Sequence, residues 1–320
     1  MAGSIQVAIP HAMQYDISYE DGNVVLVAGS ASFCVHRSVL SQHSPVFRDL
    51  FTVPQPPNVI LQEKCPVVHL PDDPTHVRYL LRALYDRSFF NDMHWLPNFA
   101  EAAAGILVLA HKYDIRHLYD EAIHRVYTAY PRTFADMNAM RCFHLEHFNA
   151  DDHAGLIFLI NVAQRLPTSE LAGFLPLAFY ICCQVNPGVL VNGVYRSDGT
   201  REKLSHDDLQ RCISGKEGLM GANTVGTLCL RPRKENVSHL CTTNDACHSA
   251  LVGMVDDALE GDIFASCDAL TNIDGWIEER ALAQKLCAFC TEHLKRRHEV
   301  ERQVVWDDLA DCFGLTFKTN

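Results

Sequence analysis

Cysteine spacing in the last third of the chain is the strongest sign of site chemistry in the sequence. Cys287 and Cys290 are three residues apart, which is the spacing of a zinc-binding pair, and His293 follows one turn later. Further candidate ligands lie upstream, at Cys241, Cys247 and His248. A tetrahedral zinc site would need four such ligands to converge, either from two helices or from a loop and a helix.

A helical apolar pattern runs through the same segment and supports a second interpretation. Cys287 and Cys290 continue an apolar stripe beside Leu286 and Phe289. Cysteines on a wide apolar face are usually small buried hydrophobic residues, so the pattern favours buried thiols and no cofactor. A disulfide is the third alternative, which a reducing compartment disfavours. The zinc alternative would use Cys241, Cys247, Cys287, Cys290 and His293.

The sequence gives little support for a second metal site or for a catalytic site. Cys142, His144 and His147 form a second group without an evident fourth ligand. The glycine-rich phosphate and dinucleotide motifs, the serine-hydrolase elbow G-x-S-x-G and the zinc-protease motif H-E-x-x-H do not occur. We therefore expect a protein that is not an enzyme.

Composition indicates a soluble protein of about two domains, because 48% of the 320 residues are hydrophobic and 21% are charged. No run approaches the roughly 20 apolar residues of a membrane span, and the first residues do not resemble a signal peptide. Thirteen cysteines, an odd number, then indicate reduced thiols in the cytoplasm or nucleus. A net charge of -12 argues against nucleic-acid binding, and the basic run 295–298 is typical of a solvated helix end.

The elements predicted for the first 130 residues describe an α+β domain. Hydrophobic periodicity and turn signals predict strands at 24–29, 31–36 and 66–70, and helices at 39–50, 75–85, 99–111 and 115–130. Asp73 or Thr75 can cap the second helix. This order predicts a small sheet covered by helices.

The remainder, from residue 134, has an almost purely helical pattern. Helices are predicted at 154–166, 171–184, 205–213, 245–260 and 276–302. Residues 187–203 are rich in Gly, Asn, Ser and charge and are typical of a surface loop, and glycines at 215, 218, 221 and 226 suggest a loosened stretch. We therefore expect 187–240 to be irregular. We predict two domains, 18–130 and 131–320, with the helical part packed against the first.

The N-terminal part resembles the BTB/POZ domain family. The opening residues that carry this resemblance are Asp21-Gly22-Asn23-Val24, Leu26, Phe33, His36-Arg37, Val39-Leu40, Ser44 and Phe47. Later family features follow in order at Val68, Leu70, Asp72-Asp73-Pro74, Val77, Leu80, Leu81, Leu84-Tyr85, Leu107, Leu109-Ala110, Lys112-Tyr113, Ile115 and Leu118. The proline-rich segment 53–66 is longer than in the family pattern.

The resemblance implies an interaction adaptor that self-associates or binds a cullin scaffold of a ubiquitin ligase. In the family, the N-terminal strand and first helix form the dimer face, which corresponds here to 13–20 and 39–47. The cullin side corresponds to 72–85 and 91–98. The candidate partner contacts are Asp21, His36, Arg37, Tyr85, Phe89, Phe90 and Trp95.

Alternatives remain open for the role of the candidate contact residues and for the function of the protein. Asp21, His36 and Arg37 can form a polar cluster that specifies the fold rather than a partner contact. The three aromatic residues can equally pin their loop to the domain. The alternative function is a transcription or chromatin-associated regulator without direct DNA contact.

The C-terminal residues resemble the tails of many fungal BTB proteins. The resemblance rests on Cys287-Ala288-Phe289-Cys290, Trp306-Asp307-Asp308-Leu309 and Phe313-Gly314-Leu315.

Overall fold

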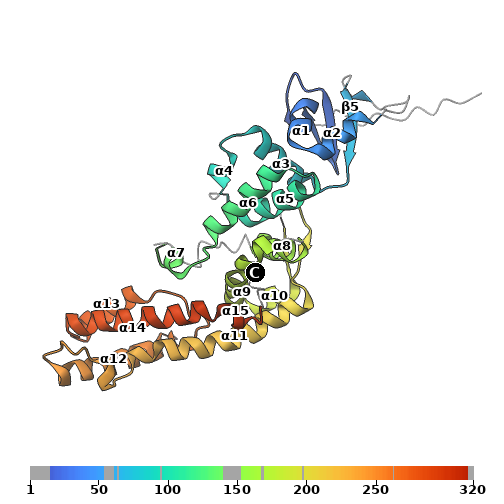
Figure 1. Ribbon diagram of the computed structural model, residues 1–320. Coiled ribbons are helices and arrows are strands. Elements are labelled where there is room, and N and C mark those ends of the chain that lie inside the picture. Colours follow the sequence, from blue (N-terminus) through green and yellow to red (C-terminus); the bar gives the residue numbers. More distant parts are fainter. Residues whose placement is uncertain are drawn as a thin grey trace, which may run out of the picture. The chain divides into compact units, whose positions relative to one another are not determined.

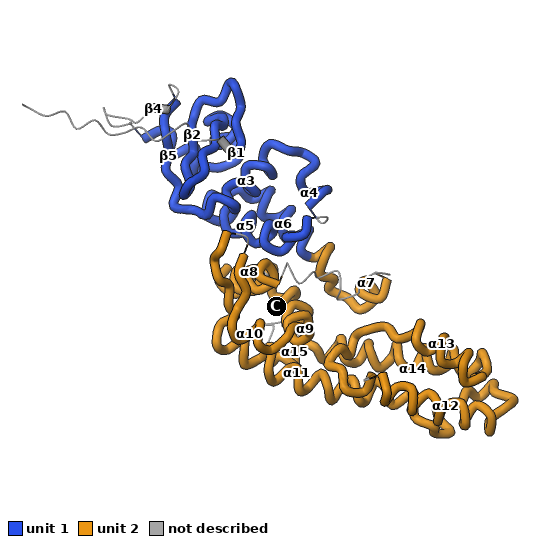
Figure 2. Tube along the Cα trace, turned by 180° about the vertical axis from the view of Figure 1, so that it is seen from behind, with its two compact units in different colours: residues 1–126 blue, residues 127–320 orange. Residues whose placement is uncertain are grey.

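The computed structural model forms two compact units, residues 1–126 and 127–320 (Figure 2). It describes residues 15–53, 61–62, 65–93, 96–139, 153–166, 169–196, 198–261 and 263–315. The boundary between the units falls inside helix α6 (Arg116–Ala129), close to the boundary expected near residue 130.

Unit 1 contains a five-stranded sheet with the order β1-β3-β2-β5-β4. The strands are β1 (Tyr15–Ser18), β2 (Val24–Ala28), β3 (Ala31–Val35), β4 (Leu61–Gln62) and β5 (Cys65–Leu70). β2 and β3 form an antiparallel hairpin, while β1 runs parallel to β3 and β5 parallel to β2. All five residues of β2 are buried, which explains its unbroken apolar sequence.

Two short helices, α1 (Arg37–His43) and α2 (Pro45–Thr52), replace the single helix expected at 39–50. The break lies at Ser44, whose extended backbone suits the residue before a proline. Buried Ser44 caps α2 by accepting a 3.0 Å hydrogen bond from the N–H of Phe47. Its hydroxyl also donates to the carbonyl oxygen of Tyr113, so the break is fixed from two sides.

The other helices of unit 1 are α3 (Pro74–Tyr85), α4 (Phe89–Asp92), α5 (Phe99–Lys112) and α6 (Figure 1). Asp73 caps α3 by accepting from the N–H groups of Thr75 and His76, which confirms one of the two predicted caps. α3 packs against α5, most of which is buried. The structure therefore confirms the predicted α+β class.

Unit 2 is mainly helical, as predicted. Its helices are α7 (Phe134–Ala139), α8 (His153–Arg165), η4 (Ser169–Phe174), α9 (Leu175–Gln184), α10 (Pro187–Asn192), α11 (His206–Gly226), η5 (Thr227–Leu230), η6 (Lys234–Asn236), α12 (Asn244–Glu260), η7 (Ile263–Ala265), α13 (Asp274–Ala283), α14 (Ala288–Asp307) and α15 (Leu309–Cys312). Its described strands are β6 (Val194–Tyr195) and β7 (Arg201–Glu202). Within the described residues, no helix is long and apolar enough to cross a bilayer.

The expectation of an irregular segment over 187–240 is wrong for 206–226, where α11 runs unbroken through Gly215, Gly218 and Gly221. Ser205 caps this helix by accepting from the N–H of Asp208. Gly215 faces Phe313, whose ring would lie only 2.2 Å from a Cβ atom at that position. This glycine therefore allows close packing rather than breaking the helix.

The helix expected at 276–302 is two helices, α13 and α14, separated by a turn. Lys285 in this turn adopts a positive φ of 59°, which ends the helical path. Consequently Leu282 and Phe289 are exposed rather than part of one apolar face. α12, α13 and α14 share a separate core that includes Leu251, Met254, Ile277 and Leu294.

Candidate functional site

Asp21, His36 and Tyr85 meet in unit 1, where the second strand of the hairpin runs into α1. His36 Nε2 lies 3.0 Å from Asp21 Oδ1, and its backbone N–H donates to the Tyr85 hydroxyl oxygen at 3.0 Å. The ring of Tyr19 stacks on that of Tyr85. The hydrogen bond from His36 lowers the pKa of the Asp21 carboxyl group, although this side chain is 87% exposed.

This arrangement is a fold junction with one exposed end. The His36 side chain is mostly buried and Tyr85 is half-buried, so both help to fix the helix start. Only Asp21 presents a charge fully to solvent. The predicted polar cluster is thus present, while a role for it in partner binding stays a prediction. Tyr19 was missed because no spacing rule links it to Tyr85.

Arg37 does not join this cluster. Its backbone N–H donates to the side-chain oxygen of Asn23 at 2.8 Å, and its guanidinium donates to the carbonyl oxygen of Phe51 at 2.8 Å. The guanidinium also lies over the Phe51 ring. The Arg37 side chain therefore contacts α2, at Phe51.

The described aromatic candidates differ in exposure, which bears on the two interpretations left open for them. Phe89 is buried beside Tyr79, and the guanidinium of Arg82 covers its ring. Phe90 is half-buried, and Trp95 lies outside the described residues. Phe89 packs into the core of its unit, which favours the interpretation that it pins its loop to the domain.

Exposed apolar side chains instead gather on α2. Among the described residues of unit 1, the large hydrophobic side chains that are exposed are Val46, Leu50 and Val53. They recur at intervals of four and three, so they lie along one side of α2 and its C-terminal end. The break at Ser44 divides the helix predicted at 39–50, and Leu50 near its end is exposed.

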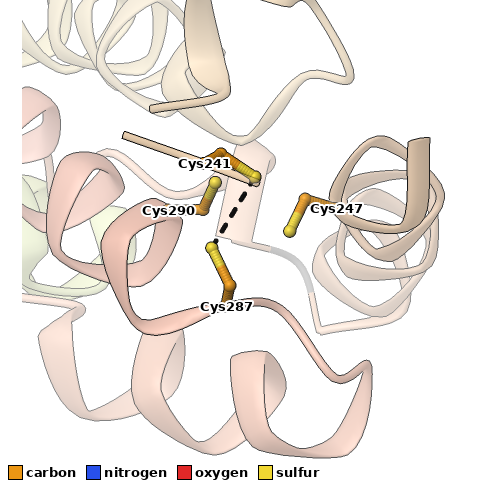
Figure 3. Close-up of side chains that lie close together, drawn as sticks. All are labelled: Cys241, Cys247, Cys287 and Cys290. Atoms are coloured by element: carbon orange, nitrogen blue, oxygen red, sulfur yellow. Dashed lines mark hydrogen bonds between the residues drawn. The ribbon is translucent and has the colours of Figure 1, made fainter. Parts of the chain in front are cut away.

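Four of the predicted zinc candidates converge in unit 2, namely Cys241, Cys247, Cys287 and Cys290 (Figure 3). Their sulfur atoms all lie within 4.8 Å of one another. Cys247 and Cys290 are buried, whereas Cys241 and Cys287 are half-buried. The thiol of Cys287 donates a hydrogen bond to the Cys241 sulfur at 3.8 Å.

Two helix starts and one loop supply these thiols. Cys247 lies in the first turn of α12, Cys290 lies in the first turn of α14, and Cys287 is the N-cap residue of α14. Cys241 precedes α12, in a turn closed by the hydrogen bond from its N–H to the carbonyl oxygen of Ser238. The expectation that Cys287 lies within a helix is therefore wrong, because the chain turns just before it.

The thiols of the cluster have pKa values shifted in opposite directions. Burial raises the pKa of the Cys241 thiol, but the N–H of Thr243 and the thiol of Cys247 outweigh burial and lower that pKa to about 7. The N–H of Thr243 donates to the Cys241 sulfur at 3.4 Å. Burial raises the pKa of the Cys287 and Cys290 thiols, which can then act as donors toward Cys241.

Neighbouring histidines do not take part in the cluster. His293 Nε2 lies 3.1 Å from the carbonyl oxygen of Glu235, and His248 Nε2 lies 2.9 Å from that of Pro232. His293 therefore holds η6 against α14 instead of completing a metal site. The second candidate group at residues 142, 144 and 147 lies outside the described residues.

Residues 18–128 match the BTB/POZ domain family. The chain carries a BTB/POZ domain at its N-terminus. This match begins at the last residue of β1, covers β2, β3, the His36 junction and α2, and ends within α6. No curated protein and no solved structure matches the chain. The resemblance of the C-terminal residues to fungal BTB proteins stays a prediction.

Asp72, in the segment that the family resemblance assigns to the cullin side, is bonded within the domain. The Asp72 carboxylate accepts from Lys112 Nζ at 2.6 Å and from the Tyr113 hydroxyl. Burial, followed by this bond to Asp72, raises the pKa of the Tyr113 hydroxyl group. Asp72 thus ties α5 to the turn before α3 and is not free to meet a partner.

Outside the BTB/POZ domain, a groove of about 600 Å³ lies between α11 and the C-terminal helices. Leu219 and Val305 are among its apolar lining residues, and Glu301, Asp308 and Asp311 add carboxylates to its lining.

BTB/POZ is an interaction domain and not a known enzyme domain. The expectation that the whole chain is not an enzyme stays a prediction.

Proposed function

We propose that the protein is an interaction adaptor that self-associates through α2 of its BTB/POZ domain. The observation that carries this proposal is the exposed apolar set Val46, Leu50 and Val53. α2 follows directly after α1, and in the family the N-terminal strand and first helix form the dimer face. Apolar side chains left in water on that face favour burial against a second copy.

Self-association is better supported than cullin binding. The presumed cullin side offers the half-buried Phe90 and Tyr85, and its Asp72 carboxylate is already bonded within the domain. Interface hot spots need side chains that become buried on binding, and α2 supplies them. Cullin scaffold binding and a regulatory role in transcription are further proposals, and both are compatible with a dimer.

The test compares the full-length chain with a Val46→Asp/Leu50→Asp double variant by size-exclusion chromatography with light scattering. We expect the wild type to have about twice the chain mass of 35.9 kDa and the variant to be monomeric, because buried charges would oppose association. Val252→Asp/Leu259→Asp is the matched control, since these α12 side chains are also exposed but lie outside the domain.

Two outcomes contradict the proposal. One is a wild type that stays monomeric at every concentration, and the other is a double variant that dimerises like the control. A pull-down with a cullin scaffold then separates the two family activities. Cullin capture that persists in the monomeric variant would place that partner on another face.

A further inference from the structure

The four-cysteine cluster has the geometry of a closed metal site. Zn–S bonds of about 2.3 Å in a regular tetrahedron place neighbouring sulfur atoms about 3.8 Å apart. The hydrogen-bonded sulfur atoms of Cys287 and Cys241 are 3.8 Å apart, and all four lie within 4.8 Å. Small movements of the side chains would therefore suffice to close the sulfur atoms around one ion.

We propose that Cys241, Cys247, Cys287 and Cys290 bind one Zn²⁺ ion as a structural tetrathiolate centre. Four thiolates are a soft ligand set, which selects zinc over the hard cations magnesium and calcium. Because all four coordination positions are filled by protein, no position remains for water or substrate. The centre stabilises the fold and does not catalyse a reaction.

The surrounding backbone favours the ionised ligands. α12 and α14 both begin at the cluster, and the positive ends of their helix dipoles stabilise nearby thiolates. The N–H of Thr243 already donates to the Cys241 sulfur, and such a hydrogen bond orients a metal ligand and stabilises its charge. Zinc binding releases the remaining thiol protons, which leave with solvent.

Buried thiols alone do not account for this arrangement. Cys229 is a buried thiol of the same core and shows the behaviour expected of a small hydrophobic residue, since it lies outside the cluster. Cys241 and Cys287 are half-buried, so they gain less from burial than a core residue would. They nevertheless point toward two buried thiols that come from different segments (Figure 3).

The position of the centre defines its role. It connects the loop that carries Cys241 to the starts of α12 and α14, at the edge of the core shared by α12, α13 and α14. Small helical cores such as this one gain stability from a metal crosslink. This proposal is independent of the interaction surface on α2.

Metal analysis of the full-length chain, purified without chelator, tests the proposal. We expect about one zinc ion per chain, and almost complete loss of zinc in Cys287→Ala and in Cys290→Ala. Cys229→Ala and His293→Ala are the matched controls and should keep the metal. Cys229 is a core thiol outside the cluster, and His293 is the nearby ligand type that bonds elsewhere.

Cobalt substitution keeps the test decisive if a cysteine variant fails to fold. Adding Co²⁺ to the wild-type chain, after its zinc has been removed, should give the visible absorption of a tetrahedral thiolate complex at about one equivalent. Wild type that binds neither ion stoichiometrically overturns the proposal. So does zinc that remains in Cys290→Ala, or stoichiometric iron in place of zinc.

Discussion

His298 on α14 is a buried histidine whose surroundings oppose its protonation. Its side chain is almost fully buried, and within the described residues its Nδ1 has no hydrogen-bond partner. Burial lowers the pKa of His298 to about 4, and the nearby guanidinium of Arg302 adds to this effect. Arg302 is held in place by Asn138 and by the carbonyl oxygen of Leu270.

This pKa shift makes the stability of unit 2 depend on pH. The folded-state pKa of about 4 lies below the ordinary value of 6.5, so the unfolded chain binds more protons between these values. The stabilising contribution is therefore complete above about pH 6.5 and is lost as the pH falls toward 4. Between about pH 7.5 and 5, the free energy of unfolding should fall by about 2 kcal/mol more in wild type than in His298→Gln. Equal losses in both proteins, measured by urea denaturation, would contradict this assignment.

The His36 junction illustrates how far residue patterns predict contacts. Asp21 and His36 belong to a recognisable order of residue types, so their meeting could be expected. Arg37 is adjacent to His36 in sequence, yet it bonds to Asn23 and Phe51. The direction of a side chain at a helix start depends on where that helix begins, and boundaries are the least certain part of a prediction.

The cysteine cluster shows a second limit of prediction from sequence, which concerns residues that are far apart in the chain. The spacing of Cys287 and Cys290 is visible in the sequence as a zinc-binding pattern, but the apolar stripe around them favoured buried thiols. The decision depends on whether Cys241 and Cys247, at least 40 residues before Cys287, reach the same point. That convergence follows from the core shared by α12, α13 and α14, which local periodicity does not encode.

At the scale of elements, the main errors came from turns without strong sequence signals. The turn between α13 and α14 contains no proline or glycine, and Lys285 adopts the positive φ itself. Conversely, the glycines of α11 were interpreted as breaks. Glycine permits both a loose backbone and a close approach, and only the partner on the neighbouring element decides which applies.

Gly215→Ala should therefore destabilise the protein, although alanine is the better helix former. A Cβ atom there would lie 2.2 Å from the Phe313 ring, which is itself fully buried. Overpacking of this kind costs about 1–3 kcal/mol, more than the roughly 1 kcal/mol that alanine adds in helix propensity. Urea denaturation of the variant measures the balance.

Gly221→Ala on the same helix provides the control. Nothing lies within 4 Å of a Cβ atom at this exposed position, so only the helix propensity changes. The control should gain up to about 1 kcal/mol in free energy of unfolding. If both variants were stabilised, the close packing of Phe313 on α11 would be incorrect.

At the scale of the whole molecule, the two proposals fall in different units. The exposed face of α2 belongs to unit 1, which has a core of its own around Val25 and Val27. The cysteine cluster belongs to unit 2 and borders the core shared by α12, α13 and α14. Family resemblance predicted the first unit in detail, whereas for the second the sequence predicted helices but not their packing.

Removal of the metal should consequently loosen one part of the chain. We expect amide hydrogen exchange, measured on the full-length protein with and without a strong chelator, to accelerate in peptides from 238–258 and 286–298. These segments hold the four cysteines and the first turns of α12 and α14, which lose their crosslink when the thiolates are released. Peptides from β2 and β3 should keep their protection, because their contacts lie in unit 1. Loss of protection in β2 and β3 as well would mean that the two units unfold together, and that the centre stabilises the whole chain rather than its own core.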